Sequence, residues 1–242
     1  MLNFLRKIRR KEMNGKYLKY AIGEVFLVVI GILIALSINN WSENSKERKF
    51  EKKMLTEIHL ALESDIDYFE ININRLNSLD SATEVMLRLI DEKAPFIDSL
   101  YNQSRRRSYF LATGIIYQYN PGPYEALKAT GVDKIKNDSL RKELINLYDF
   151  EYPRHKEFIV YYDQDYKTQM TKFFGMMEPP FIEIVNGQRS ISQKFPSNLL
   201  QRPDFLILLN QLRSRATIQL RSFNNFIPNL KRVKSLLSEE LN

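Results

Sequence analysis

The chain contains no cysteine and only two histidines among its 242 residues. Without cysteine, a disulfide framework, a thiolate zinc site, an iron–sulfur cluster and a cysteine nucleophile are all excluded. The two histidines, His59 and His155, are too few for a histidine-rich metal centre. Neither follows a glutamate at the Glu-x-x-His spacing of di-iron helical bundles. We therefore predict no metal site and no cofactor.

Recognisable catalytic motifs are missing as well. The sequence has no glycine-rich phosphate loop, no Gly-x-Ser-x-Gly elbow and no His-Glu-x-x-His. His59 and Glu63 share a helix face, but two ligands are too few for zinc. Asp163 and Asp165, two residues apart, point away from each other on a helix and are expected at the surface. We predict no catalytic residue and do not expect an enzyme.

Charge is unevenly distributed along the chain. The formal net charge is +7, but residues 1–19 contain seven Lys or Arg and one Glu, so this tail carries +6 and the remaining 223 residues carry +1. A near-neutral body does not favour nucleic acid as a partner. The tail is instead expected to contact anionic lipid headgroups. The residues assigned to this role are Arg6, Lys7, Arg9, Arg10 and Lys11.

A long apolar run follows the basic tail. Residues 21–38 contain one ionisable side chain, Glu24, and no proline. A helix over residues 20–41 would rise about 31 Å, close to the ~30 Å hydrocarbon thickness of a bilayer. Tyr17, Tyr20 and Trp41 flank the run at the level where aromatic rings anchor in the headgroup region. We predict a basic tail at 1–19, a transmembrane helix at 20–41 and a separate domain at 42–242.

The flanking charges predict an orientation for this helix. Seven Lys or Arg precede it and five follow it within residues 42–60. Because Lys and Arg accumulate on the cytoplasmic side, we expect a cytoplasmic N-terminus and a body on the other side of the membrane. The alternative is a cleaved signal peptide, since Ala35-Leu36-Ser37 fits a small-x-small cleavage site. Against it, the apolar run is longer than a usual signal-peptide core.

Three residues of the predicted span suggest a contact with another helix. Glu24 and Gly31 are seven residues apart and share a face, and Ala35 completes a small-xxx-small pattern with Gly31. A carboxylate in a membrane helix usually faces a partner or water. We predict self-association or a partner contact through Glu24, Gly31 and Ala35. The alternative is a carboxyl group that reaches the interface, one turn inside Tyr20.

The body is predicted to be all-α, an antiparallel helical bundle with one small β-hairpin. Glycine and proline are absent between Ile32 and Lys93, so the spanning helix is expected to continue into the first bundle helix. In that helix apolar residues recur every 3.5 residues on average, the spacing of bundle seams. These residues are Leu55, Ile58, Leu62, Ile66, Phe69, Ile73 and Leu76.

Local signals place the later elements. Asp138 or Ser139 is expected to cap a helix that starts at Leu140, and Pro153 is expected to kink or break it. Asn186-Gly187, between β-prone flanks, predicts a two-stranded hairpin over residues 181–192. A last helix is expected to begin at Pro203.

Two features of the body are candidates for ligand binding. Tyr162 and Tyr166 lie beside Arg154 and His155 and are candidates for a pocket between helices, although core packing is the alternative. The basic run at residues 105–107 is a candidate anion site or, alternatively, a solvated connection.

The N-terminal residues resemble a known family. Tyr20-Ala-Ile-Gly-Glu24, the apolar run from Leu27 to Leu36 and Ile38-Asn-Asn-Trp41 are similar to the N-terminus of an uncharacterised family of single-pass envelope proteins of Bacteroidota. The segments 124–131 and 135–148 look like the middle of that family. The resemblance implies a bacterial inner-membrane protein with a periplasmic helical domain. It implies no activity.

These observations leave three functional hypotheses. The first is a membrane-anchored interaction or scaffold protein of an envelope complex, with membrane lipid and a homo-oligomer or larger assembly as partners. The second is a periplasmic ligand-sensing bundle that signals through a partner, an analogy with helical receptor domains. The third is an uncharacterised enzyme. We rank them in this order because the sequence offers residues for location and contact but none for a reaction.

Overall fold

The structure, a computed structural model, describes residues 2–95, 110–112 and 114–242, with side chains from Lys19 onward. The chain divides into two compact units, residues 1–53 and 54–242. Helix α1 (Leu2–Asp91) belongs to both. The prediction of an all-α chain with one small hairpin is confirmed. The basic run at 105–107 lies outside the described residues.

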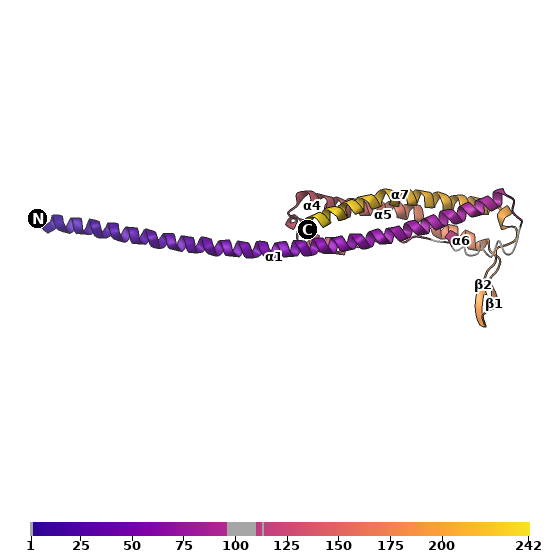
Figure 1. Ribbon diagram of the computed structural model, residues 1–242, viewed down its shortest axis with the longest axis horizontal. Helices are drawn as coiled ribbons and strands as arrows, with labels where there is room; N and C mark the ends of the chain where they lie inside the picture. Colours follow the sequence, from indigo (N-terminus) through magenta and orange to yellow (C-terminus); the bar gives the residue numbers. More distant parts are fainter. Residues whose placement is uncertain (1, 96–109, 113) are drawn as a thin grey trace. The chain divides into compact units, whose positions relative to one another are not determined.

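The first unit consists of α1 alone (Figure 1). Its central part is long and apolar enough to cross a membrane, and none of its most apolar window is buried. Leu27 is 70% exposed and Trp41 is 74% exposed. The predicted absence of a helix break is also confirmed, because α1 continues without interruption past Ile32 into the second unit.

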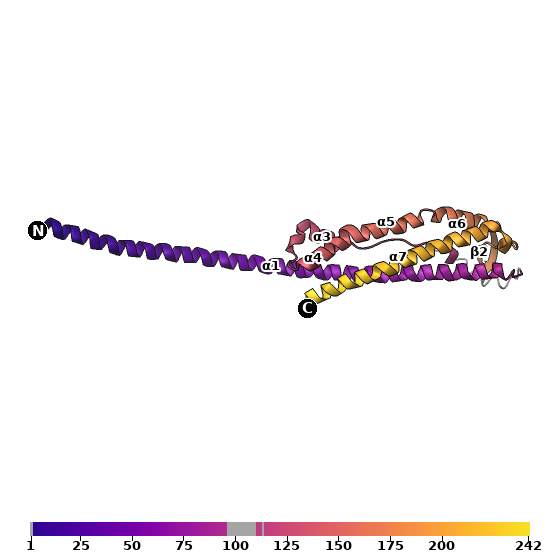
Figure 2. The ribbon, with the colours of Figure 1, turned by 90° about the horizontal axis from the view of Figure 1, so that it is seen from above.

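The second unit is a helical bundle. Besides residues 54–91 of α1 it contains α3 (Gly122–Thr130), α4 (Asp138–Ile145), α5 (Tyr152–Asp163), α6 (Tyr166–Gly175) and α7 (Pro203–Leu241). Short 3₁₀ turns lie at Val132–Lys134 and Leu199–Gln201. Figure 2 shows α5 and α6 following one another beside α7. Helices α4, α5 and α6 each pack on α7.

Helix α7 runs antiparallel to the second half of α1. Lys234 pairs with Glu63 at 2.6 Å, whereas Arg213, further back on α7, pairs with Glu84 at 2.8 Å, further along α1. The core lies between these helices and the α4–α6 layer. Six of the seven predicted seam residues are buried, and Ile73 is the partly exposed exception. The neighbouring Asn72 is fully buried in its place.

Two local predictions need correction or refinement. The cap of α4 is Asn137, not Asp138 or Ser139: its side chain accepts hydrogen bonds from the backbone N–H of Ser139 and Leu140, both at 3.1 Å. The irregularity expected near Pro153 takes the form of a π-helical segment, Asn146–Glu151, between α4 and α5. Pro153 is the second residue of α5 and has no N–H to donate, so the helical hydrogen-bond ladder is interrupted where the π-helical segment ends.

The predicted hairpin is confirmed. Strands β1 (Phe181–Val185) and β2 (Gln188–Ser192) pair antiparallel, with Ile182 opposite Ile191. Asn186 and Gly187 have φ values of 51° and 78°, the two positive φ angles that a tight type I′ turn requires. The hairpin projects from the helices of the second unit (Figure 1).

Candidate functional site

A groove of about 620 Å³ lies between α5 and α7 in the second unit. This volume is within the range of small-molecule sites in proteins. One wall is formed by residues of α5 and of the π-helical segment before it: Glu151, Arg154, His155, Phe158 and Tyr162. The other wall is formed by residues of α7: Thr217, Ile218, Arg221, Ser222, Asn225 and Phe226.

Helical spacing explains why these side chains meet. On α5, Arg154, Phe158 and Tyr162 are four residues apart and share one face. On α7, Ile218 and Ser222 are also four apart, so the lining forms a stripe on each helix. Because α5 packs on α7, the two stripes face each other. Tyr162 and Phe158 also contact each other, with ring centroids 4.9 Å apart.

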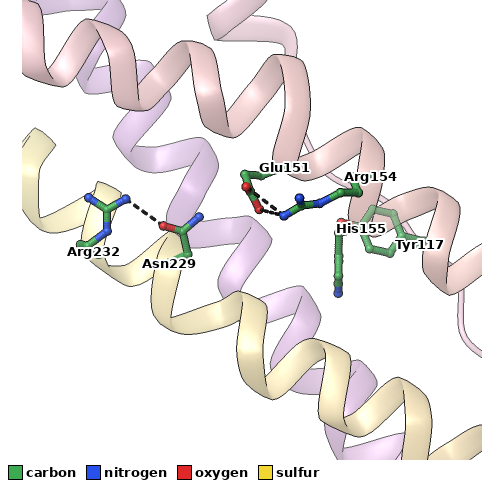
Figure 3. A network of polar contacts seen from close by, with 6 residues as sticks. All are labelled: Tyr117, Glu151, Arg154, His155, Asn229 and Arg232. Atoms are coloured by element: carbon green, nitrogen blue, oxygen red, sulfur yellow. Dashed lines mark hydrogen bonds and ion pairs between the residues drawn. The ribbon is translucent and has the colours of Figure 1, made fainter.

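His155 lies at the base of the groove among aromatic rings. Its side chain is 8% exposed and stacks on Phe226 with ring centroids 4.2 Å apart. Nδ1 lies 2.9 Å from the Tyr117 hydroxyl, and the two rings lie side by side in Figure 3. Within the described part of the chain, Nε2 is buried without a hydrogen-bond partner. Burial lowers the pKa of His155 to about 4, and the backbone of Ser222 acts against this shift. The imidazole is therefore neutral at pH 7.

Two arginines bring positive charge to the groove. Arg154 points outward and donates to both carboxylate oxygens of Glu151, at 3.0 and 2.9 Å (Figure 3). Arg221 is exposed and forms no ion pair with any residue that the structure describes. With one glutamate and two arginines, the groove carries a formal charge of +1. Among the residues that the structure describes, Arg221 is the groove cation without an ion pair.

The four residues predicted as a pocket do not all meet. Arg154, His155 and Tyr162 line the groove, but Tyr166 does not. The Tyr166 hydroxyl instead donates to the carbonyl oxygen of Ala112, and its ring packs tightly against Gly114. The guanidinium of Arg215 covers the same ring, 4.7 Å from its centroid. Tyr166 therefore holds the segment before α3 against the bundle.

The expectation of a surface position for Asp163 is wrong, whereas Asp165 is exposed as expected. Asp163 is partly buried and lies 3.4 Å from Arg215, a guanidinium whose residue is 5% exposed. Burial raises the pKa of Asp163, and the nearby Arg215 limits the increase. The two residues form a partly buried ion pair that joins the C-terminal end of α5 to α7.

Sequence reasoning missed Asp65, a carboxylate that is only 4% exposed and accepts two hydrogen bonds. Asp65 accepts hydrogen bonds from the Tyr152 hydroxyl at 2.8 Å and from the backbone N–H of Asn120 at 2.9 Å. Burial raises its pKa, and these two hydrogen bonds oppose the increase. Asp65 lies three residues after Leu62 and four before Phe69. This places it on the apolar seam of α1, and the sequence could have predicted its burial from that position. Asp65 fastens the connection before α3 to α1 and α5.

His59 and Glu63 each contact a different side chain of α7. The His59 Nε2 atom lies 2.9 Å from the Ser238 hydroxyl, and Glu63 pairs with Lys234 at 2.6 Å. The pairing with Lys234 lowers the pKa of Glu63. Among the described residues, no group of three or more His, Cys, Asp or Glu side chains is placed to hold a metal ion.

The residues assigned to the membrane segment lie in the first unit. Tyr20 is 78% exposed, and Glu24, Gly31 and Ala35 lie on an exposed face of α1. The side chains of Tyr17 and of the tail residues Arg6, Lys7, Arg9, Arg10 and Lys11 lie outside the described part. Their roles, like the partner contact, stay predictions.

A family model matches residues 24–178, about two thirds of the chain. The chain belongs to DUF6090, a family of unknown function. The predicted membership of an uncharacterised family is thereby confirmed, whereas its bacterial group and single-pass topology stay predictions. The DUF6090 match includes α5 but ends before α7, so it contains one wall of the groove. Neither the curated proteins nor the solved structures gave a match.

Proposed function

We propose that this DUF6090 protein is a membrane-anchored interaction protein of the bacterial inner membrane. Residues 20–41 cross the bilayer, the basic tail lies in the cytoplasm and the bundle lies in the periplasm. The observation that carries the proposal is α1 itself, in which an exposed apolar stretch continues without a break into a core helix of the bundle. A partner bound in the membrane and one bound by the bundle would thus contact the same helix.

Exposure of the apolar stretch supports the anchor. Ile22, Val25, Leu27 and Val28 are each more than half exposed, and at 100° per residue they point in different directions around the helix. Exposing an apolar area of this extent to water is unfavourable, and transferring it to hydrocarbon is favourable. A bilayer therefore supplies the environment that this part of the chain lacks.

The proposed contact in the membrane uses Glu24, Gly31 and Ala35. A Cβ atom added at Gly31 would meet nothing within 4 Å, so this face is open to a second helix. Small residues let helices approach closely in a bilayer. We assign the face to a second copy of α1 or to a helix of a larger complex.

Extraction and topology experiments test the anchor. The full chain should stay in membranes washed with carbonate, and its N-terminal sequence should begin before Ala35. In spheroplasts, added protease should digest the bundle and leave a tag on the N-terminus intact. A mature chain that begins near Ile38, or a bundle protected from protease, would refute the anchor or its orientation.

Assembly size tests the helix contact. Gly31→Leu and Glu24→Gln should each reduce cross-linking of the full chain in membranes. Val29→Leu is the matched control, because it adds bulk on the opposite face of the same helix. Equal cross-linking in all three variants would count against a contact through this face.

A ligand-sensing bundle is the second candidate function. The observation that favours it is the groove between α5 and α7, with its exposed Arg221 and its aromatic base. In this function the bundle would pass its signal to a partner protein.

A further inference from the structure

We propose that the groove between α5 and α7 binds a small aromatic carboxylate, with the carboxylate on Arg221 and the ring against Phe158 and Phe226. This inference deepens the second candidate function and does not depend on the membrane anchor.

Charge selects the sign of the ligand. Arg221 is exposed on the groove wall and has no ion pair within the described ranges. Arg154 is held by Glu151, whose two carboxylate oxygens accept from the same guanidinium nitrogen. An anion therefore gains most from Arg221, and a guanidinium suits the planar carboxylate group. A ligand with two or three negative charges would also be repelled by the Glu151 carboxylate.

The lining selects the body of the ligand. Phe158 is 39% exposed, which is high for a phenylalanine that lines a groove, and it lies next to Tyr162. Phe226 closes the base together with the neutral imidazole of His155. Aromatic rings favour a further ring at offset or edge-on geometry. Because the described residues at this base, Phe226 and His155, are uncharged, a ring can bind there without removing water from a charged group.

The polar residues of α7 set the limit on ligand size and character. Thr217, Ser222 and Asn225 share the wall with Ile218, so one side of the groove is amphipathic. A long acyl chain would leave these groups without partners, whereas a compact ring leaves them accessible to water. The groove therefore favours a small aromatic acid over a fatty acid.

Calorimetric titration of the full chain in lipid nanodiscs tests the proposal. The probe is 4-hydroxyphenylacetate, with octanoate and inorganic phosphate as the comparison ligands. We expect the aromatic acid to bind saturably, with a dissociation constant between about 10 µM and 1 mM, the affinity that a ligand of this size can reach. Binding of octanoate should be at least tenfold weaker and phosphate should not bind. Equal affinity for octanoate, or no binding of the aromatic acid up to 10-fold above this range, would overturn the proposal.

Variants locate the binding in the groove. Arg221→Gln should weaken the affinity about tenfold or more, because it removes the charge-assisted hydrogen bonds. Ile218→Trp should block binding by filling the groove, and the thermal unfolding midpoint shows whether the bundle stays folded. Arg189→Gln, an exposed arginine on β2, is the matched control and should leave the affinity unchanged. Unchanged affinity in both groove variants would overturn the assignment.

Other outcomes separate this inference from the anchor. A chain that is released from membranes but still binds the probe would refute the anchor and leave the groove assignment intact. If Ile218→Trp alters cross-linking between chains while probe binding is unchanged, the groove belongs to a protein contact and the ligand proposal is wrong.

Discussion

Two stretches of α1 put similar apolar side chains to opposite uses. Between residues 19 and 41 the apolar residues other than the partly exposed Ile30 are exposed: Leu33 is 57% and Ile34 is 54% accessible. Between residues 54 and 86 the apolar residues of the seam are buried except for the partly exposed Ile73, and Leu62 is 0% exposed. Both stretches are the same regular helix. Helix formation itself therefore does not distinguish them.

The difference lies in how the apolar residues are arranged around the helix. In the first stretch they occupy every side, so no packing of one helix on another could cover them all. In the second they follow a 3.5-residue spacing that leaves charged residues such as Glu63 and Glu70 on the outside. The first arrangement calls for an apolar solvent and the second for neighbouring helices.

The largest expected effect comes from placing charge in the first stretch. Val29→Arg combined with Leu33→Arg should release the chain from membranes, since each arginine near the bilayer centre costs about 2.5–3.5 kcal/mol. Flotation with liposomes measures the bound fraction. Leu60→Arg, at a 57% exposed position of the second stretch, is the control and should leave flotation unchanged. Full flotation of the double variant would contradict the anchor.

The second largest effect is expected when a buried apolar side chain of the second stretch is shortened. Leu62→Ala should lower the free energy of unfolding of the bundle by about 2–5 kcal/mol, because it leaves a cavity at a fully buried position. Leu33→Ala should leave it unchanged. Urea denaturation of the full chain in nanodiscs, followed by circular dichroism at constant lipid concentration, compares the two. Equal midpoints would mean that the seam contributes no more than the exposed stretch.

A third effect concerns a polar group buried by the same packing. The unfolded His155 has its ordinary pKa of 6.5, but burial lowers it to about 4 in the folded chain. Between these values the unfolded state binds more protons, so the free energy of unfolding falls as the pH falls from 6.5 toward 4. The full loss is about 3 kcal/mol. Denaturation midpoints against pH measure it.

His155→Phe should reduce that slope, since the proton uptake on unfolding disappears. Asp65→Asn provides a control of opposite sign. Burial raises the pKa of Asp65, so its contribution to the free energy of unfolding falls as the pH rises above 3.8. An unchanged slope between pH 4 and 6.5 in the His155 variant would show that the imidazole is not buried neutral.

The smallest expected effect is on the outer face of the second stretch. Glu70 pairs with Lys231 of α7 at 2.8 Å, with both side chains about half exposed. Glu70→Ala should change the free energy of unfolding by less than about 1 kcal/mol, because water screens exposed ion pairs. Thermal unfolding at low and high salt measures the change. A loss as large as that of Leu62→Ala would contradict the division between a polar outside and an apolar seam.

The sequence was a good guide where a local pattern decides the structure. Asn186-Gly187 predicted the hairpin because few residue pairs adopt two consecutive positive φ angles. The apolar seam of α1 was predicted because a periodic stripe must be covered. The cap of α4 was misplaced by one or two residues, since Asn, Asp and Ser are all favoured capping residues and local sequence does not choose among Asn137, Asp138 and Ser139.

The candidate site was only partly accessible from the sequence. Arg154, His155 and Tyr162 share a helix face, so their proximity follows from spacing. Tyr166 is three residues beyond Asp163, the last residue of α5, and begins α6, where its hydroxyl reaches Ala112. The α7 wall, Arg221 included, is separated from α5 by about 60 residues, and no local pattern connects them.

By itself, the sequence determined that the chain is helical, that its positive charge lies in the tail and that one stretch is apolar on every side. These are properties of composition and of short-range spacing. Only the tertiary structure decided which polar groups lose water: His155 among aromatic rings, Asp65 under Tyr152 and Asp163 beside Arg215. Burial is fixed by contacts between residues far apart in the chain, so their altered pKa values and the groove beside them depend on how the helices pack.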